Sequence, residues 1–400
     1  MDENNKSQRA SEAWEMVMSN ITDDLWTEIF LRLPFESLLR FKSVSKTWLS
    51  IISSHRFALS HLAIAPKDDQ ILIVHHETGY PEDGEDGHFS LYHLDPCRIL
   101  ENLNFPYSQG EYPFELDNSQ LIGSECGIVC VSVCVSDWKA AKNKYDLYLW
   151  NPATKQSKLI PPYARPDNTM SRAALGFGFD HIDLDFKVVR FISSTLSAEV
   201  YSSNMNNWRK IEQNLSDIYG YISFYICFHG FLFALQDYRG TKGMVAFDLN
   251  KEVFICDNNL PVGSFEYVEY SKIAQYKDTI AFIVSDSITD NNKINLWILD
   301  NIACLRGGVE ASWTKVLSFD VGAPYDVVEG PFNDIQFLLE DVDCINRLLY
   351  NSNNKLTTEF PGFPKIAPCE LFKYTKSLFS LTGFKRIKWA APSLRLQENL

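Results

Sequence analysis

A strand-and-turn unit that recurs about every 50 residues is the feature that most constrains the fold of this 400-residue chain. In each copy an apolar run ends at an Asp, Asn or Ser, which opens a polar turn before the next apolar run. The turn-opening residues are Asp95, Asn151, Ser202, Asp248, Asp300 and Asn351, at separations of 56, 51, 46, 52 and 51 residues. Runs rich in Val, Ile, Phe, Tyr and Trp between such turns are typical of β-strands.

Further apolar runs upstream of some turns, at 127–131, 230–235 and 279–284, bring each period to about four strands. One such sheet cannot bury both of its faces, so consecutive sheets must stack, and closing them into a ring protects most strand edges. A period near 50 residues is typical of kelch-type propeller blades. The repeat therefore predicts an all-β propeller of six blades, with seven blades or an open β-sandwich as alternatives.

The stretch 20–57 has helical rather than strand periodicity. Thr22 can cap a first helix, because its side chain accepts from free N–H groups of the first turn, and Pro34 ends that helix. The apolar surface is wider than the usual arc. It consists of one stripe of Leu25, Ile29 and Leu33 and a second stripe of Trp26 and Phe30.

Two more short helices are predicted, one from about Glu36 and one around Trp48. Their apolar positions are Leu38, Leu39, Phe41, Val44, Trp48, Ile51 and Ile52. A unit of about 40 residues buries too little of its own surface to be stable alone. Its surplus apolar positions must be covered either by a partner protein or by the rest of the same chain, and periodicity alone leaves both possibilities open.

This stretch resembles an F-box, the three-helix module that docks on the Skp-family adaptor of cullin ubiquitin ligases. The resemblance rests on Leu25, Glu28-Ile29, Arg32-Leu33-Pro34, residues 37–42, 44–48, Ile51-Ile52 and Phe57. It implies adaptor contacts at Ile21, Leu25, Ile29, Pro34, Leu38, Val44 and Trp48. Ile21-Thr22 replaces the usual opening Leu-Pro, so a capping threonine stands in place of a rigid proline.

The remainder resembles the F-box-associated domain of plant F-box proteins. The matching segments are 149–154 with 159–162, 176–180 with 185–189, and 199–201 with 207–208. A narrower resemblance, to S-locus F-box proteins, implies a stylar ribonuclease as the substrate. The whole resemblance implies a non-catalytic substrate-recognition subunit of an SCF-type E3 ubiquitin ligase, linked through the adaptor to a cullin and a RING subunit. An F-box protein without a role in ubiquitin transfer and a propeller enzyme are the alternatives.

Composition excludes several classes of partner. The formal net charge of −14 and the pI near 5.1 argue against nucleic acid or an anionic membrane, which both need a basic face. No secretory signal and no membrane span is recognisable, so a cytoplasmic location is expected, with the nucleus as a second compartment. The nine cysteines have no framework spacing and are expected to be reduced thiols.

No motif predicts a catalytic, cofactor or metal site. Gly176 and Gly178 lack the third glycine of a nucleotide-binding loop, since residue 181 is a histidine. Asp180, His181, Asp183 and Asp185 lack EF-hand spacing and are interpreted as a polar hairpin. On one strand face Cys126, Cys130 and Cys134 would each lie about 13 Å from the next. This is too far to share a zinc ion, so they are interpreted as core residues.

The sequence thus predicts an α + β multidomain protein with a three-helix F-box followed by a propeller. The expected divisions are a flexible N-terminal segment (1–19), the F-box (20–62), the propeller (63–390) and a C-terminal tail (391–400). Substrate recognition is expected on propeller loops. The candidates are the loops 80–87, 163–172, 286–293 and 323–333, whose distribution between the two rims the sequence leaves open.

Overall fold

The computed structural model describes residues 21–64, 71–76, 88–94, 97–103, 119–137, 142–163, 173–238, 241–257, 260–261, 270–286, 293–306, 311–321, 327–331, 333–340, 347–359, 369–381 and 383–386. The predicted flexible segment 1–19, the tail 391–400 and the loop 80–87 lie outside these residues. In the described part of the chain, no helix is both long enough and apolar enough to span a bilayer.

Four helices precede the β-region in the described chain: α2 (Asp23–Leu31), α3 (Phe35–Phe41), α4 (Lys46–Ile52) and α5 (His55–Ile64). Thr22 caps α2 as predicted, with its Oγ1 accepting from the N–H of Leu25 at 3.4 Å. The three predicted helices are present, and a fourth helix, α5, follows them. α5 begins directly after Ser53-Ser54, where the Ser54 hydroxyl accepts from the N–H of Phe57 at 3.2 Å and starts a new helix.

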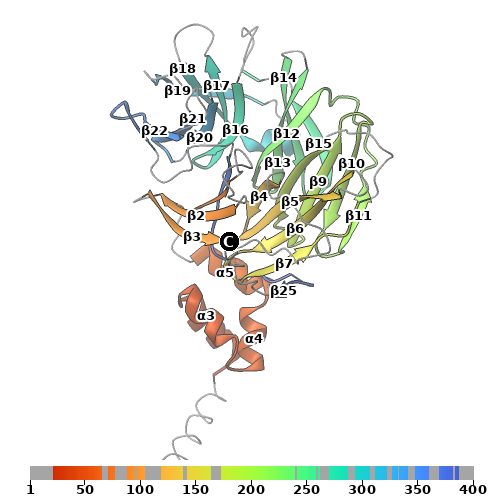
Figure 1. The fold of residues 1–400 in the computed structure, drawn as a ribbon, viewed down its shortest axis with the longest axis vertical. Helices are drawn as coiled ribbons and strands as arrows, with labels where there is room; N and C mark the ends of the chain where they lie inside the picture. Colours follow the sequence, from red (N-terminus) through yellow and green to blue (C-terminus); the bar gives the residue numbers. More distant parts are fainter. Residues whose placement is uncertain are drawn as a thin grey trace, which may run out of the picture.

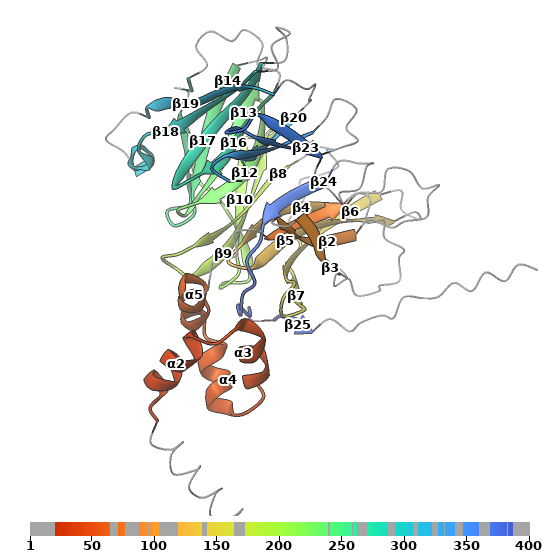
Figure 2. The ribbon, with the colours of Figure 1, turned by 90° about the vertical axis from the view of Figure 1, so that its left-hand side faces the viewer.

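Six antiparallel sheets follow, which confirms the predicted propeller of six blades (Figures 1 and 2). Blade 1 contains β24 (Cys369–Lys373), β1 (Ile71–His76), β2 (His88–Leu94) and β3 (Cys97–Leu103). Blade 2 contains β4 (Gln120–Glu125), β5 (Ile128–Asp137), β6 (Lys142–Asn151) and β7 (Gln156–Leu159), to which β25 (Lys385–Arg386) adds a fifth strand. Blade 3 contains β8 (Ala174–Asp180), β9 (Asp185–Ile192), β10 (Ser197–Ser202) and β11 (Asn207–Lys210).

Blade 4 contains β12 (Tyr221–Phe228), β13 (Phe231–Tyr238), β14 (Thr241–Asp248) and β15 (Val253–Asp257). Blade 5 contains β16 (Tyr270–Tyr276), β17 (Thr279–Asp286), β18 (Lys293–Leu299) and β19 (Trp313–Asp320), with the 3-10 helix η3 (Ile302–Arg306) between its last two strands. Blade 6 contains β20 (Val327–Pro331), β21 (Gln336–Glu340), β22 (Arg347–Asn351) and β23 (Leu356–Glu359). The innermost strands β24, β4, β8, β12, β16 and β20 contact one another in succession around the channel.

The ring is closed by joining the two ends of the β-region in one sheet. β24 pairs antiparallel with β1, so blade 1 takes its inner strand from the C-terminal part of the chain. A separate hydrophobic cluster fills the space between each pair of neighbouring blades. The smallest cluster joins Leu72, Val74 and Tyr92 of blade 1 to Leu338 of blade 6. Each sheet therefore buries both faces, as the repeat requires.

The turn-opening residues that the structure describes lie at or directly after the end of the third strand of a blade. They are Asn151, Ser202, Asp248, Asp300 and Asn351. The Asn151 Oδ1 accepts from the N–H of Thr154 at 3.1 Å, and Asp248 and Asn351 accept in the same way from backbone N–H groups two residues on. Four residues after the opening residue the backbone is left-handed in several blades, with φ of 57° at Glu252 and 58° at Lys355. In blades 2, 3, 4 and 6 the recurring Asn, Ser or Asp is thus explained by side-chain capping of its own turn. In blade 5 the neighbouring Asn301 accepts from the N–H of Ala303 instead.

Strand direction divides the loops between the two rims of the propeller. Because strands alternate in direction, the first-to-second and third-to-fourth strand turns all lie at one rim, and the other connections lie at the opposite rim. The helices are at the rim of the tight turns (Figures 1 and 2). The strand ends that flank the predicted loops 80–87, 163–172 and 286–293 all lie at the far rim. The predicted loop 323–333 contains β20, whose start is at the far rim, whereas Asn333 belongs to the tight turn after β20 on the helix side.

Candidate functional site

The helices have one apolar face that the other described residues of the chain leave exposed. On α2, the side chains of Leu25 and Ile29 are one helical turn apart and are 54% and 42% exposed. Val44, between α3 and α4, is 59% exposed. Pro34 is also exposed and Ile21 is half-buried. Four of the seven predicted adaptor contacts are therefore exposed, and Ile21 is partly accessible.

The remaining two predicted contacts pack mainly inside the helical module. Leu38 has no exposed surface and belongs to the core. Trp48 is half-buried, with its ring centroid 4.8 Å from that of Trp26 and 5.0 Å from that of Phe30. The wide apolar arc predicted for the first helix is thus divided between two tasks. Trp26 and Phe30 form the interior, whereas Leu25 and Ile29 remain outside.

The covered side of the helices is fixed to the propeller by a shared core. Phe30, Leu38, Ile52 and Phe57 belong to the hydrophobic cluster that fills the space between blades 2 and 3. Helices and propeller therefore pack as one body rather than as two modules joined only by a linker. This packing accounts for part of the apolar surplus, so the same chain covers one face of the helices. The exposed face remains accessible to a partner.

A segment that follows β24, here called the strap (Tyr374–Leu381), runs between the helices and the propeller. Phe379 is fully buried, with its ring centroid 5.3 Å from that of Phe186 and 5.4 Å from that of His55. The Asn151 amide donates to the carbonyls of Ser377 and Phe379, both at 2.9 Å. The strap thus connects blade 2, blade 3 and α5.

Polar contacts on the helix side reinforce the strap. A ring nitrogen of His55 lies 3.3 Å from the carbonyl of Ser380, and Lys376 Nζ donates to Glu36 Oε1 of α3 at 3.3 Å. A backbone hydrogen bond at the start of α3, together with Lys376, lowers the pKa of Glu36 despite partial burial. Glu36 therefore remains ionised and paired with the strap at neutral pH.

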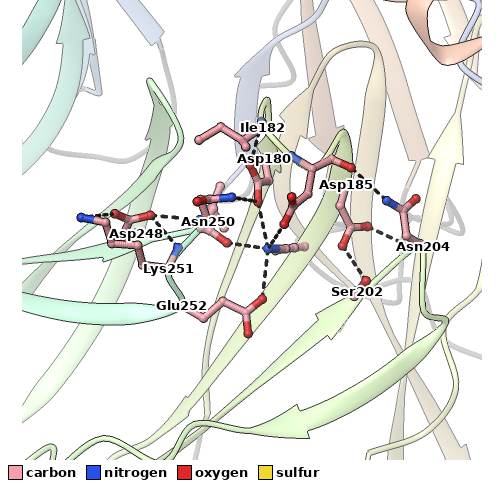
Figure 3. Close-up of polar contacts among 12 residues, drawn as sticks. Asp180, Ile182, Asp185, Ser202, Asn204, Asp248, Asn250, Lys251 and Glu252 are labelled. Carbon is pink, nitrogen blue, oxygen red and sulfur yellow. Dashed lines mark hydrogen bonds and ion pairs between the residues drawn. The ribbon is translucent and has the colours of Figure 1, made fainter.

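A second polar cluster joins the tight turns of blades 3 and 4 on the helix-side rim (Figure 3). Lys187 has 2% of its side chain exposed, and its Nζ lies 2.9 Å from Asp180 Oδ2, 3.0 Å from Glu252 Oε1 and 2.6 Å from the carbonyl of Leu249. Asn250 also donates to Asp180, at 3.3 Å. Every donor of the ammonium group is therefore satisfied, as a buried charge requires.

The same cluster shows what the predicted polar hairpin does. Burial would raise the pKa of Asp180, but hydrogen bonds from Lys187 and from the N–H groups of Ile182 and Asp183 outweigh it and lower that pKa. Asp185 accepts from the hydroxyls of Ser202 and Ser203 in the neighbouring turn. These carboxylates are occupied with structural bonds. Among the described residues, no group of three or more His, Cys, Asp or Glu side chains is arranged to hold a metal ion.

One sequence interpretation needs correction at the cysteines. Cys126 is not on the strand with Cys130 but in the β4–β5 turn, with φ of 49°, because Glu125 to Gly127 reverse the chain. Cys130 is fully buried, as predicted. Burial raises the pKa of the thiols of Cys126 and Cys130, so both remain protonated and weakly nucleophilic. The side chain of Cys134 lies outside the described residues.

Two functional features escaped the sequence reasoning. Leu49 of α4 is 45% exposed and adds to the uncovered apolar surface. Its helical phase relative to Ile51 and Ile52 could have indicated that Leu49 lies on another face of α4. The strap had no local signal, because its partners on blade 2 and α5 lie far away in the sequence.

The folded chain is thus a two-part protein, in which a β-propeller presents a small helical module. Residues 90–315 match the F-box associated beta propeller domain, and residues 18–60 match the F-box domain. The propeller match covers more than half of the chain. The chain therefore belongs to the F-box-associated β-propeller family and is a plant F-box protein.

Two relatives from Arabidopsis thaliana illustrate the similarity. F-box/kelch-repeat protein At3g23880 is 32% identical over 202 residues, which cover 48% of this chain and 51% of the relative. F-box protein CPR1 is 26% identical over 377 residues, which cover 85% of this chain and 81% of the relative. The chain thus spans about half the length of the first relative. Among solved structures, TolB from Acinetobacter baumannii aligns with a TM-score of 0.42 at 11% identity, over 80% of this chain and 71% of TolB.

Proposed function

We propose that this chain is the substrate-recognition subunit of an SCF-type E3 ubiquitin ligase. Its helices dock on a Skp-family adaptor, and through the adaptor on a cullin and a RING subunit. The propeller holds a protein substrate for ubiquitination and subsequent proteasomal degradation. The chain acts in the cytoplasm, with the nucleus as a second compartment, and contributes no catalytic group.

The observation that carries the proposal is the uncovered apolar face of Leu25, Ile29 and Val44 on a module whose other face is fixed to the propeller. Burying a large apolar side chain contributes roughly 1.5–3 kcal/mol. Several such residues can support a stable interface after association costs. We place Ile21, Leu25, Ile29, Pro34 and Val44 at the adaptor interface, whereas Leu38 and Trp48 stabilise the helices that present them.

Rigid attachment gives this arrangement its mechanism. Because helices and propeller share a core, a substrate bound to the propeller is held at a defined distance from the adaptor. A ligase of this kind raises the effective concentration of substrate lysines near the ubiquitin-charged enzyme, and no bond is made by the receptor itself. The far rim, opposite the helices, is the surface that we assign to substrate.

The test is co-purification of the full chain with a Skp-family adaptor. Leu25→Asp/Val44→Asp places two charges on the docking face without disturbing the buried residues, and is expected to weaken adaptor binding at least about a hundredfold, since an unpaired buried charge costs several kcal/mol. The matched control is Leu196→Asp/Leu356→Asp, which charges two propeller leucines that are 45% and 60% exposed. Equal adaptor recovery by both variants would place the docking face elsewhere.

The alternative, an F-box protein without a role in ubiquitin transfer, is separated by a second measurement. Proteins that bind the wild-type chain and accumulate under proteasome inhibition should lose ubiquitin conjugates in the Leu25→Asp/Val44→Asp variant. Binding partners whose ubiquitination is indifferent to that variant favour the alternative. A basic S-ribonuclease is one substrate that a net charge of −14 would attract at long range, and pollen expression with direct binding tests it.

A further inference from the structure

A cavity of about 240 Å³ opens between the inner strands of blades 4, 5 and 6. It is lined by Tyr225, Ser271, Lys272, Ile283, Ser285, Val328 and Glu329. Ser271 and Lys272 are near the start of β16, and Val328 and Glu329 are near the start of β20. Because both strands begin at the rim opposite the helices, the cavity belongs to the half of the channel that faces away from the docking face.

Hydrogen-bond donors predominate among the polar groups of this cavity. Among the described residues, Lys272 Nζ makes one hydrogen bond, to Glu329 Oε2 at 2.8 Å, whereas an ammonium group has three donors. The Ser271 hydroxyl accepts from Lys242 Nζ at 3.0 Å, which leaves its own hydrogen available to donate. Burial and the nearby Asp237 raise the pKa of Tyr225, so its hydroxyl also remains protonated and able to donate.

The one carboxylate in the lining is already neutralised. Glu329 lies 2.8 Å from Lys272 and 3.9 Å from Arg347. Burial would raise its pKa, but Lys272 and Arg347 outweigh burial and lower the pKa, so Glu329 is an ionised and paired group. The cavity can therefore gain from an incoming acceptor more than from an incoming cation, which would have to displace Lys272.

Size and lining restrict the occupant further. Pockets for drug-sized ligands are typically about 300–1,000 Å³, so this cavity suits one side chain or chain end better than a whole cofactor. Ile283 and Val328 supply apolar walls, which strengthen polar contacts by excluding water.

We propose that this cavity is a recognition pocket for a carboxylate of the protein substrate, supplied by an Asp or Glu side chain or by the C-terminal carboxylate. The inference rests on the proposed function, because it assigns the pocket to the substrate of a ligase receptor. Lys272, Ser271 and Tyr225 donate to the carboxylate. The overall negative charge acts at long range, whereas this pocket selects a single group at contact distance.

The test is affinity selection on the full chain captured through its bound adaptor. The probes are two random octapeptide pools, one ending in a free carboxylate and one in an amide, and peptides recovered from each pool are sequenced. Wild-type chain is expected to enrich Asp and Glu at one position in both pools, or to enrich peptides only from the free-carboxylate pool. The first result identifies a side-chain carboxylate as the ligand, and the second identifies a chain end.

Variants then tie the selection to the cavity. Lys272→Met removes the charge, and Tyr225→Phe removes only one hydroxyl, so that a folded variant remains even if the first substitution disturbs the Glu329 pair. Each should weaken binding of a recovered peptide by about tenfold or more, because a hydrogen bond to a charged group contributes roughly 1.5–3 kcal/mol. Lys315→Met is the control, since Lys315 is an exposed lysine over the Trp297 ring on the outer strands of blade 5.

The outcomes separate this inference from the proposed function. Loss of adaptor capture by the wild-type chain would contradict the ligase receptor itself. Normal adaptor capture with no acidic or carboxylate-dependent enrichment, or with enrichment that Lys272→Met and Tyr225→Phe leave unchanged, would overturn the pocket alone. Enrichment of Lys or Arg would likewise overturn it.

Discussion

A single asparagine shows how one repeat position can acquire a second task. The carbonyl oxygen of the Asn151 side chain caps its own turn, as the equivalent groups of Asp248 and Asn351 do. The Asn151 amide nitrogen, which an aspartate would lack, also holds two carbonyls of the strap. Only in blade 2 does the opening residue, among those the structure describes, combine both roles.

Asn151→Asp is therefore expected to destabilise the protein, because a carboxylate would face two buried carbonyl oxygens. The expected loss in unfolding free energy is about 2–4 kcal/mol, since each buried group left unsatisfied costs about 1–3 kcal/mol. Chemical denaturation of the purified chain measures it. Asn351→Asp is the control and should change little, because Asp248 already performs that capping role in blade 4. Equal losses in both variants would contradict the strap role of Asn151.

The sequence predicted the turn role of Asn151 but not its bond to the strap. Turn capping is local and recurs, so spacing reveals it. The strap carbonyls at Ser377 and Phe379 lie 226 and 228 residues further along the chain, and nothing in the local pattern marks them. The same limit applies to Leu38, whose helical phase predicts an apolar contact but not whether its own chain or a partner provides it.

At the scale of elements, the strap and α5 are the parts that convert two modules into one body. The fourth helix escaped prediction because the apolar pattern of 55–64 is short and directly follows the third helix. Its burial depends on tertiary contacts, with Phe57 and Ala58 inside the cluster between blades 2 and 3. The periodicity of apolar residues predicts that a segment is helical, but it does not predict where the helix packs.

Phe379→Ala is expected to loosen the helices from the propeller. Removing a buried aromatic ring costs about 3–5 kcal/mol, and here the cavity would open between His55 and Phe186. Amide hydrogen exchange in α5 should increase more than exchange in blade 4. Phe282→Ala is the matched control, because Phe282 is equally buried but lies in the cluster between blades 4 and 5. An increase in α5 exchange of the same size in both variants would contradict a specific role for the strap.

At the scale of the whole molecule, closure of the ring depends on one strand from the C-terminal part of the chain. β24 pairs with β1, and the backbone N–H of Leu121 in blade 2 donates to the Glu370 carboxylate of β24. The six-fold repeat predicted the number of blades. It did not predict that blade 1 is built from both ends of the β-region, because the spacing of turns is the same whichever end supplies the inner strand.

Nested truncations test the closure. Deleting residues 369–400 removes β24 and the strap, so β1 becomes an exposed edge and the apolar faces of blades 1 and 2 lose their cover. This variant is expected to lose cooperative unfolding and to aggregate, as measured by denaturant titration and size-exclusion chromatography. Deleting only residues 385–400 removes the short β25 pairing and should leave a monomer that unfolds cooperatively. A cooperative monomer from the longer deletion would show that the ring does not need β24.

The pairing of β24 with β1 also determines when the propeller can close during biosynthesis. Both β24 and the strap emerge from the ribosome after nearly all of the blades, yet the helices at the other end of the chain need the strap to settle against the propeller. Until then, the apolar surfaces of the nascent helices remain uncovered and accessible to chaperones. A translating ribosome that stalls before β24 would release a product whose ring is not closed.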